Sequence, residues 1–361
     1  MTDREAYVAF NLTEKVGIAT VEGLVAEHGS VAAAWEAYPK KVSRTGGEID
    51  WQGEFKTAGK FGVTILTPAD ADYPSQLKTV PGRPLVLYVK GDAKALARPS
   101  IALIGTRRAT SYGLSVANRM AYDLAKSGFA VVSGLALGID AESHRGALSA
   151  GGVTVGVIGS GLDRFYPEEN RELAREMVAK GGAVVSEFPF GRPADKTTFP
   201  IRNHVVAALA KGVVAVEAPV KSGTLITTGI AADLGRTVMA VPARVDNRMS
   251  SGCLRLIRDG AVLVRDADDV IEAVGDLFAG RPRAESPSRE TDARDPQTPP
   301  YSVEEALLMT HVDEDGVALD ELARLTQLPV GKVNALAMAL RIKGFVRFLP
   351  GNRISLLTQR H

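Results

Sequence analysis

Small and polar residues follow four aliphatic segments of this 361-residue chain, where the turn after a buried strand would place them. Glycines in such turns let the backbone approach an anion closely, and N–H groups at the start of the next helix attract it. One glycine-rich turn would be weak evidence, but four turns at one edge of a sheet predict an anion-binding rim. The candidate residues are Thr106, Arg107, Arg108, Gly134, Ser160, Gly161, Ser222, Gly223 and Thr224.

The sequence around these turns restricts which anion the rim can hold. The first aliphatic segment, residues 101–105, is not followed by the G-x-G-x-x-G pattern of a dinucleotide site. The second ends in Ser133 rather than in the acid that binds a ribose hydroxyl, and the sequence has no G-x-x-x-x-G-K-[ST] pattern. Hydride transfer and P-loop nucleotide hydrolysis are therefore not expected.

The segment DKTTFPIRNH, residues 195–204, combines positive charge with an aromatic ring. Lys196, Arg202 and Asn203 can donate hydrogen bonds to phosphates and base edges, and Phe199 lies between them in the sequence. Basic groups interleaved with aromatic rings are typical of proteins that bind single strands, whose unpaired bases stack on the rings. The alternative is that Phe199 fills the core and Arg202 caps a helix. With Arg107 and its neighbour on the same rim, we favour single-strand binding.

Asp140 and His144 lie four residues apart after Ser133 and could supply an acid, a base and a nucleophile. No nucleophile-elbow pattern surrounds Ser133, however, and Asp140 stands where a helix is expected to begin. An acid at that position stabilises the helix start, so we interpret both residues as structural.

The aliphatic segments repeat in a regular alternation with segments of helical length. Such short and almost continuously apolar runs are typical of parallel strands that are covered on both faces. They predict an α/β fold with a doubly wound, Rossmann-like parallel sheet over about residues 71–275, whose ligand lies at the carboxyl ends of the strands. The expected strands are 101–105, 129–133, 153–159, 182–187, 212–217, 237–242 and 261–264.

The chain is expected to divide into three domains and a linker. Residues 1–66 resemble a helical SAM or helix-hairpin-helix domain with a hairpin at residues 16–19, and residues 67–278 form the Rossmann-like domain. Residues 279–300 contain five prolines and alternating charges, which is typical of a solvated linker. The hairpin can bind a DNA backbone, and a docking role of the helical bundle is an equal alternative.

Residues 301–361 show three helical segments followed by two strand-like runs around a Pro-Gly-Asn turn. Three helices with a β-ribbon predict a winged helix. The segment has as many acidic as basic residues, unlike a typical DNA reader. Lys332 and Arg341 are candidates for DNA contact, and a protein-contact or packing role is at least as well supported.

The totals exclude several other classes of protein. A formal net charge of +1 shows no global basic excess, so a nucleic acid would have to bind at a local patch. Cys253 is the only cysteine, which excludes an internal disulfide, and the five histidines are too scattered to suggest a metal site. The first residues lack a signal-peptide pattern and no apolar run reaches the ~18 residues of a membrane span, so a cytoplasmic protein is expected.

Eight ordered motifs together resemble the bacterial DNA-processing protein A family, also called DprA or Smf. The resemblance is strong over about residues 70–265, and the two ends fit the same architecture more loosely. The motifs are IALIGTRRATSYG, VVSGLALGIDAESHRGAL, GVIGSGLDRFYPEEN, SEFPFG, FPIRN, VEAPVKSGTLIT, GRTVMAVP and SSGCLRLIRDGA.

The resemblance implies a protein without catalytic activity, metal or cofactor that binds and shields incoming single-stranded DNA during natural transformation. It also implies RecA as a partner that is loaded onto this DNA, and a homodimer through the Rossmann-like domain. Duplex DNA is a further candidate partner. The family's DNA-contacting positions match Arg107, Lys196 and Phe199, together with the regions of Arg202, Asn203 and the S-G-T loop.

Three positions depart from the family pattern. His204 stands where an arginine is usual, Ala243 replaces a glycine, and Cys253 replaces an asparagine. The first departure affects one expected basic contact, and the other two affect the shape of the loops over residues 243–253.

The alternative function is a nucleotide-binding phosphoribohydrolase that resembles the lonely-guy enzymes. Those enzymes carry a glycine-rich loop that holds a nucleotide phosphate and is followed by an essential acid. In this chain the corresponding run is residues 220–227, and the acid position is Thr227. Without that carboxylate the hydrolase would lack its general acid/base, so we favour DNA binding.

Overall fold

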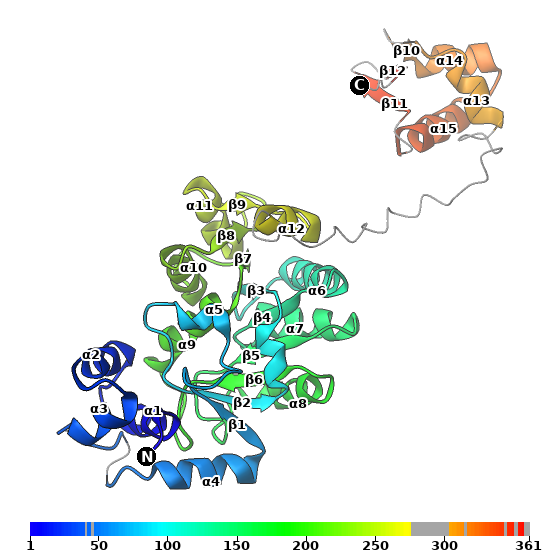
Figure 1. Cartoon of the computed structure of the whole chain (residues 1–361). Helices are drawn as coiled ribbons and strands as arrows, with labels where there is room; N and C mark the ends of the chain where they lie inside the picture. The colour runs from blue at the N-terminus through cyan, green and yellow to red at the C-terminus, as the bar shows by residue number, and fades with distance from the viewer. Residues whose placement is uncertain are drawn as a thin grey trace. The chain divides into compact units, whose positions relative to one another are not determined.

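The computed structural model describes residues 1–39, 42–44, 47–275, 303–313, 316–342, 345–349 and 353–356. The chain divides into two compact units, Met1–Ala284 and Glu285–His361, which are described separately (Figure 1). The expected linker, residues 279–300, lies outside the described residues. No helix in the described part of the chain is both long and apolar enough to cross a membrane.

A nine-stranded sheet organises the first unit, in the order β1-β2-β6-β5-β4-β3-β7-β8-β9. The seven strands from β3 onward run parallel, as the sequence predicts, whereas β2 pairs antiparallel with β6 and β1 antiparallel with β2. The strands are β1 Val63–Leu66, β2 Leu87–Gly91, β3 Ser100–Gly105, β4 Ala130–Ser133, β5 Thr154–Val157, β6 Ala183–Ser186, β7 Gly212–Glu217, β8 Thr237–Ala240 and β9 Val262–Leu263.

The order of the strands creates a topological switch point between β3 and β7. From β3 the chain builds the sheet outward through β4, β5 and β6, and then returns to place β7 on the other side of β3. Open α/β sheets bind their ligands at the carboxyl ends of the strands beside such a point. The loops that follow β3 and β7 therefore lie at the expected position.

Helices cover both faces of the sheet because alternate strand residues point to opposite sides. Ala102 and Ile104 pack with α5, α9 and α10 on one face, whereas Ile101 and Leu103 pack with α6, α7 and α12 on the other. The helices on the two faces of this sheet are α5 Ser75–Lys78, α6 Ser111–Lys126, α7 Ile139–Ser149, α8 Arg171–Ala179, α9 Thr198–Leu209, α10 Gly223–Asp233, α11 Ser251–Arg258 and α12 Ala267–Gly275. Short 3-10 turns lie at Ala93–Ala97, Glu168–Asn170 and Arg248–Ser250.

Four N-terminal helices pack against the antiparallel end of this sheet. Phe10 of α1 contacts Trp35 of α3 edge-to-face at 5.1 Å, in a core that also contains Ile65 of β1 and Tyr88 of β2. Residues 63–66, which the sequence analysis assigned to the helical domain, therefore belong to the sheet. The helices are α1 Asp3–Leu12, α2 Ile18–His28, α3 Val31–Ala37 and α4 Trp51–Phe61.

The second unit has the expected winged-helix elements. Its helices are α13 Val303–Met309, α14 Leu319–Thr326 and α15 Val330–Ile342. A three-stranded sheet in the order β10-β12-β11 completes it, with β10 Val317–Ala318, β11 Val346–Leu349 and β12 Arg353–Leu356. The core of this unit contains Leu322 of α14, Leu340 of α15 and Ile354 of β12.

Candidate nucleic-acid interface

The loop after β3 is tied down on both sides and presents Arg107 and Arg108 on the surface. The Thr106 amide donates to the Glu217 carbonyl at 2.7 Å, and its hydroxyl accepts from the Arg108 amide at 3.2 Å. Gly138 has φ +78°, and a Cβ there would lie 2.4 Å from the Thr106 carbonyl oxygen. The close approach of this glycine lets the loop rest on the start of α7.

Glu217 connects this loop to the end of β7. Its carboxylate is buried and accepts hydrogen bonds from the Thr110 amide and hydroxyl, both at 2.8 Å. Thr110 is also the N-cap of α6, where its hydroxyl accepts from the Gly113 amide at 3.2 Å. The arginine loop is therefore fixed at the switch point by the backbone and the carboxylate of Glu217, the last residue of the adjacent strand β7.

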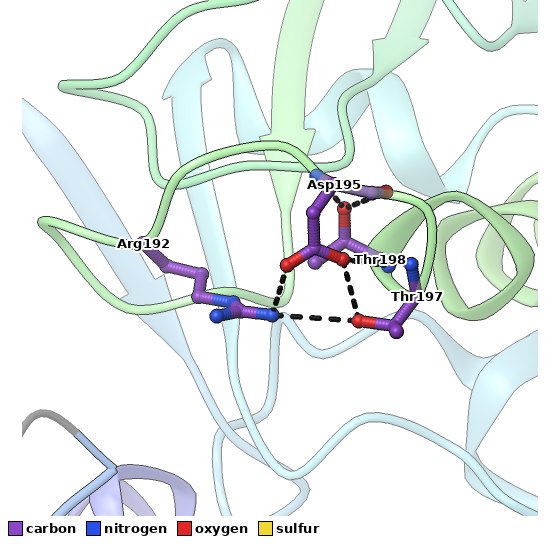
Figure 2. Close-up of polar contacts among 4 residues, drawn as sticks. All are labelled: Arg192, Asp195, Thr197 and Thr198. Carbon is purple, nitrogen blue, oxygen red and sulfur yellow. Dashed lines mark hydrogen bonds and ion pairs between the residues drawn. The ribbon is translucent and has the colours of Figure 1, made fainter.

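A second fixed loop precedes α9 and carries Lys196. The Asp195 carboxylate accepts from the Thr197 amide at 2.7 Å and the Thr198 amide at 3.1 Å, and pairs with the Arg192 guanidinium at 2.5 Å (Figure 2). The hydrogen bond from the Thr197 hydroxyl holds the pKa of Asp195 below its usual value. Lys196 is exposed between these anchored residues.

The ring of Phe199 has a guanidinium and a second aromatic ring as neighbours. Its centroid is 5.0 Å from the Arg107 Cζ and 6.1 Å from the centroid of Tyr166. Phe199 is half-buried, and a Cβ at Gly159 would come within 3.2 Å of its ring. These residues line a small pocket of about 50 Å³, which we call the Phe199 pocket. Enclosed small-molecule sites usually hold 300–1,000 Å³, so this one fits an open stacking surface better.

Arg202 lines this pocket from below and is almost fully buried. Its Nη1 donates to the carbonyl oxygens of Gly134 and of Val157, the latter at 2.7 Å, and its Nε donates to the Asn203 Oδ1 at 3.1 Å. The side chain is buried, which lowers its pKa to about 10, while the nearby Asp140 carboxylate opposes this shift. Arg202 was predicted as a DNA-contacting donor, but its contacts give it the role of the pocket floor.

Burial raises the pKa of Asp140, and the Arg202 charge acts against this effect. The Asp140 Oδ2 accepts from the Ala136 amide at 3.4 Å. The two buried side chains lie close to each other beside Gly134, and the hydrogen bonds of Arg202 to the Gly134 and Val157 carbonyl groups join the ends of β4 and β5. Gly134 contributes its carbonyl oxygen to this arrangement, and a Cβ at that residue would lie 2.2 Å from the Arg202 Nη1.

The loop after β5 is joined to the segment after β6. The Ser160 carbonyl accepts from the Ser186 hydroxyl at 2.6 Å, and the Gly161 amide donates to the Arg192 carbonyl at 2.8 Å. Within the described residues the buried Ser160 hydroxyl has no hydrogen-bond partner. Ser160 and Gly161, which the sequence predicted as part of the anion-binding rim, are buried and hold the loop in place.

The loop after β7 brings Ser222, Gly223 and Thr224 to the start of α10. Gly223 is exposed, with open space around its Cα, whereas Thr224 is buried. The Ser222 hydroxyl is buried and lacks a partner among the residues that the structure describes. Thr227, at the acid position of the hydrolase alternative, donates its hydroxyl to the Gly223 carbonyl at 3.2 Å.

His144 and Ser133 have separate partners and do not form a nucleophile–base pair. The Ser133 hydroxyl donates to the Leu103 carbonyl at 2.6 Å. The Thr154 hydroxyl donates to the Val131 carbonyl, so the His144 Nδ1, 2.6 Å from it, must carry the hydrogen. Burial lowers the pKa of His144 to about 3. This geometry supports the structural interpretation of Asp140 and His144.

The sequence analysis missed Tyr166 and Leu137, which also line the Phe199 pocket. Tyr166 is 49% exposed, so its ring is accessible from solvent beside Phe199. The available signal was the aromatic pair Phe165–Tyr166 directly after a glycine-rich turn.

The departures from the family pattern lie away from the Phe199 ring contacts. His204 is half-buried beside Gly82, and burial lowers its pKa. Cys253 is buried, its Sγ donates to the Ala215 carbonyl at 3.5 Å, and burial raises its pKa to about 12. Ala243 is half-buried. Among the described residues no three His, Cys, Asp or Glu side chains gather as a metal site would require.

Comparison with known proteins gives consistent matches over both units. Residues 64–275 match the family DNA recombination-mediator protein A, and residues 292–352 match the DprA winged helix domain. Protein Smf of Synechocystis is 35% identical over 315 residues, which is 80% of this chain and 79% of that protein. DNA processing protein DprA of Bacillus subtilis is 38% identical over 58% of this chain and 71% of its own.

Solved structures agree with the sequence matches. The structure of DprA from Streptococcus pneumoniae superposes with a TM-score of 0.64 at 30% identity, covering 75% of this chain and 98% of that one. A structure of DNA processing protein A from Helicobacter pylori, described for its single-stranded DNA binding mode, has a TM-score of 0.54 at 29% identity. It covers 60% of this chain and 97% of its own.

Proposed function

The chain belongs to the DNA recombination-mediator protein A family, and on this premise we propose that it binds single-stranded DNA at the Phe199 pocket. The observation that carries the proposal is the Phe199 ring, half-buried beside the Arg107 guanidinium and the Tyr166 ring. An unpaired base stacks on such a ring, while Arg107, Arg108 and Lys196 neutralise the phosphates on either side. The Helicobacter pylori relative described for this mode of binding supports the same ligand.

The predicted residues divide into two groups in the proposed site, those that contact the strand and those that support the contacting residues. Arg107, Arg108, Lys196, Phe199 and Gly223 are exposed or half-buried and contact the strand. The remaining predicted residues hold the surface in shape from below or beside it. These supporting residues are Thr106, Gly134, Ser160, Gly161, Arg202, Asn203, Ser222 and Thr224.

We propose that the protein acts by binding and not by turnover. In this role it shields incoming DNA during natural transformation and presents it to RecA, with two copies associated through the Rossmann-like unit. Family membership supports this role, and the geometry of Ser133, His144 and Thr227 offers no assembled acid–base pair for hydrolysis.

Binding of labelled oligo-dT beside the matching duplex, titrated with salt, tests the proposal. If about three to five phosphates are neutralised, log K should fall against log salt with a slope of roughly −2 to −3.5, since each single-strand phosphate contributes ~0.7. Arg107→Ala and Lys196→Ala should each reduce the slope by about 0.7, whereas Arg175→Ala, an exposed arginine on α8, should not.

A slope near zero, or equal losses in the Arg175→Ala control, would contradict a localised binding site. The same preparation should release no base from nucleoside monophosphates and hydrolyse no ATP. Turnover that a site variant abolishes would show instead that the protein is an enzyme.

A further inference from the structure

A second and larger hollow adjoins the Phe199 pocket. It has a volume of about 400 Å³ and is lined by the loop after β5, the first residue of α8 and the loop after β6. Ligand-sized sites begin at about 300 Å³, so this hollow, unlike the Phe199 pocket, has room for a nucleotide. We call it the Phe165 groove, and its lining is Asp163, Arg164, Phe165, Tyr166 and Arg171, with Pro193 and Ala194 opposite.

Tyr166 is the wall that the groove and the Phe199 pocket have in common. Its ring is 6.1 Å from the Phe199 ring, and the two planes are tilted by 47°. Two rings at this distance and angle leave no space for a base between them, so each must offer a separate face. Lys196 is two residues beyond Ala194 on the opposite wall, so the basic loop of the proposed site continues into the groove.

The groove repeats the chemistry of the Phe199 pocket. The Arg171 Cζ lies 5.2 Å from the centroid of the Phe165 ring, as the Arg107 Cζ lies 5.0 Å from that of Phe199. The side chains of Arg164 and Arg171 are 64% and 39% exposed, so both can reach a phosphate. A stacking face beside an arginine is the pairing that single-strand grooves use.

Carboxylates hold these groups in place without preventing a phosphate from binding. The Asp163 carboxylate accepts from the Gly191 amide at 2.8 and 3.0 Å, which joins the two walls of the groove. Glu168 pairs with Arg171 at 2.5 Å and 2.6 Å on the exposed side. Both partners of this ion pair are on the surface, where water screens it, so a DNA phosphate can compete with Glu168 for Arg171.

We propose that the Phe165 groove is a second nucleotide subsite, which binds the neighbouring nucleotide of the DNA strand held in the Phe199 pocket. The base stacks on the exposed ring of Tyr166 and on the part of the half-buried Phe165 ring that the core beside α8 leaves open, and its phosphate lies against Arg164 and Arg171. This inference rests on the proposed function, because the Phe199 pocket sets where the strand enters.

A length series of oligo-dT, from about 2 to about 12 nucleotides, tests the subsite on the full chain. The affinity of the wild-type protein should rise steeply once the strand is long enough to fill both the Phe199 pocket and the Phe165 groove. The double variant Arg164→Ala/Arg171→Ala should bind the shortest oligomer that the wild type still binds with unchanged affinity. For longer oligomers its affinity should be about 5- to 20-fold lower than that of the wild type, and the slope of log K against log salt should be smaller by about 1.4. Both arginines are exposed, so the melting temperature should not change.

The matched control is Arg145→Ala/Arg175→Ala, which removes the same charge from the α7–α8 surface. These arginines are also exposed and ion-paired, with Glu142 and Glu172, but they line a different hollow. The subsite proposal is contradicted if the groove variant keeps the full gain in affinity with oligomer length, or if the control variant loses as much affinity as the groove variant. Failure of every oligomer to bind the wild-type protein would instead overturn the proposed function itself.

Discussion

At the scale of single residues, Phe199 shows how neighbours determine what an aromatic ring can do. Its ring contacts Arg107 and Tyr166, both exposed, and rests on Gly159. It does not belong to the apolar clusters of the described residues, which contain Val205 and Val206 from the next turns of the same helix. These contacts favour a stacking surface over a core position.

Phe199→Ala should therefore weaken oligo-dT binding by about 1 to 3 kcal/mol, the usual contribution of one base–aromatic stack, with little change in melting temperature. A ring that filled the core would instead cost ~3 to 5 kcal/mol of folding stability. Calorimetric melting and anisotropy titration distinguish the two cases. Phe199→Tyr and Phe199→Trp serve as controls, since a stacking face tolerates a larger ring. A destabilised alanine variant whose folded fraction binds normally would contradict the stacking role.

Arg202 marks the limit of what the sequence could predict about the site. The pattern K-x-x-F-P-x-R indicated a basic and aromatic surface, and the structure places Arg107, Lys196 and Phe199 on the accessible side of it. Arg202 is instead buried, and it donates hydrogen bonds to the carbonyl groups of two residues that lie 68 and 45 positions away along the chain. Local sequence carries no information about such distant partners, so an exposed and a buried arginine look the same.

At the scale of elements, the apolar runs and the β-propensity of the sequence predicted seven strands. These are the seven parallel strands of the sheet, β3 to β9. The two missed strands, β1 and β2, are antiparallel additions at one edge, and β2 ends in the polar Lys90 and Gly91. Residues 85–89 are nevertheless a continuous apolar run, and β2 is covered on both faces, by Leu87 and Val89 in the core of the sheet and by Tyr88 in the core of the N-terminal helices. The apolar run of β2 was therefore an available signal, whereas β1 is only four residues long and is interrupted by Thr64.

The junction between these helices and the sheet contains an unusual acid, Glu187. The Asn11 amide of α1 donates to the Glu187 carbonyl at 3.3 Å, and Glu54 of α4 accepts from the Phe190 amide at 3.0 Å. Burial raises the pKa of Glu187 to about 8, and the Arg44 charge opposes this shift. Its Oε1 has no hydrogen-bond partner among the described residues.

Glu187→Gln should stabilise the protein in a pH-dependent way. The pKa of Glu187 in the folded protein lies above its value of 4.5 in the unfolded chain. Protonated Glu187 therefore makes its full contribution to the free energy of unfolding below pH 4.5, and this contribution is lost as the pH rises through 8. Glutamine resembles the protonated acid, so the gain should be near zero at pH 4.5 and reach about 1 to 3 kcal/mol by pH 9. Urea unfolding at three pH values measures this difference, with the exposed Glu172→Gln as control. An equal gain at every pH would show that the carboxyl group is not buried in its neutral form.

At the scale of the whole molecule, the residues proposed to contact DNA all lie in the first unit, Met1–Ala284. The expected boundary between residues 1–66 and 67–278 divides a shared core, since Leu85, Val86 and Tyr88 pack with α1 and α3. We propose that the helical part acts as a support for the Rossmann-like sheet rather than as an independent DNA reader. The winged helix, by contrast, has a core of its own.

The basic side chains that made the winged helix a candidate DNA reader are already engaged within it. The Lys332 Nζ pairs with the Glu304 carboxylate, and the Arg341 Cζ lies 5.5 Å from the centroid of the Phe348 ring. Phosphate binding would have to replace both interactions. We therefore expect the tail to contribute little to single-strand affinity, in agreement with its balanced charge.

Lys332→Ala/Arg341→Ala in the full chain should leave the affinity for oligo-dT and its salt slope unchanged, and so should a chain that ends at residue 284. The physical reason is that the slope counts phosphates neutralised, and the neutralising groups Arg107, Arg108 and Lys196 remain in both variants. Anisotropy titrations at three salt concentrations measure the slope directly, and Arg107→Ala in the same two backgrounds should still remove about 0.7 from it. A slope that falls by ~0.7 per tail cation removed would show instead that the winged helix binds the strand along with the sheet edge.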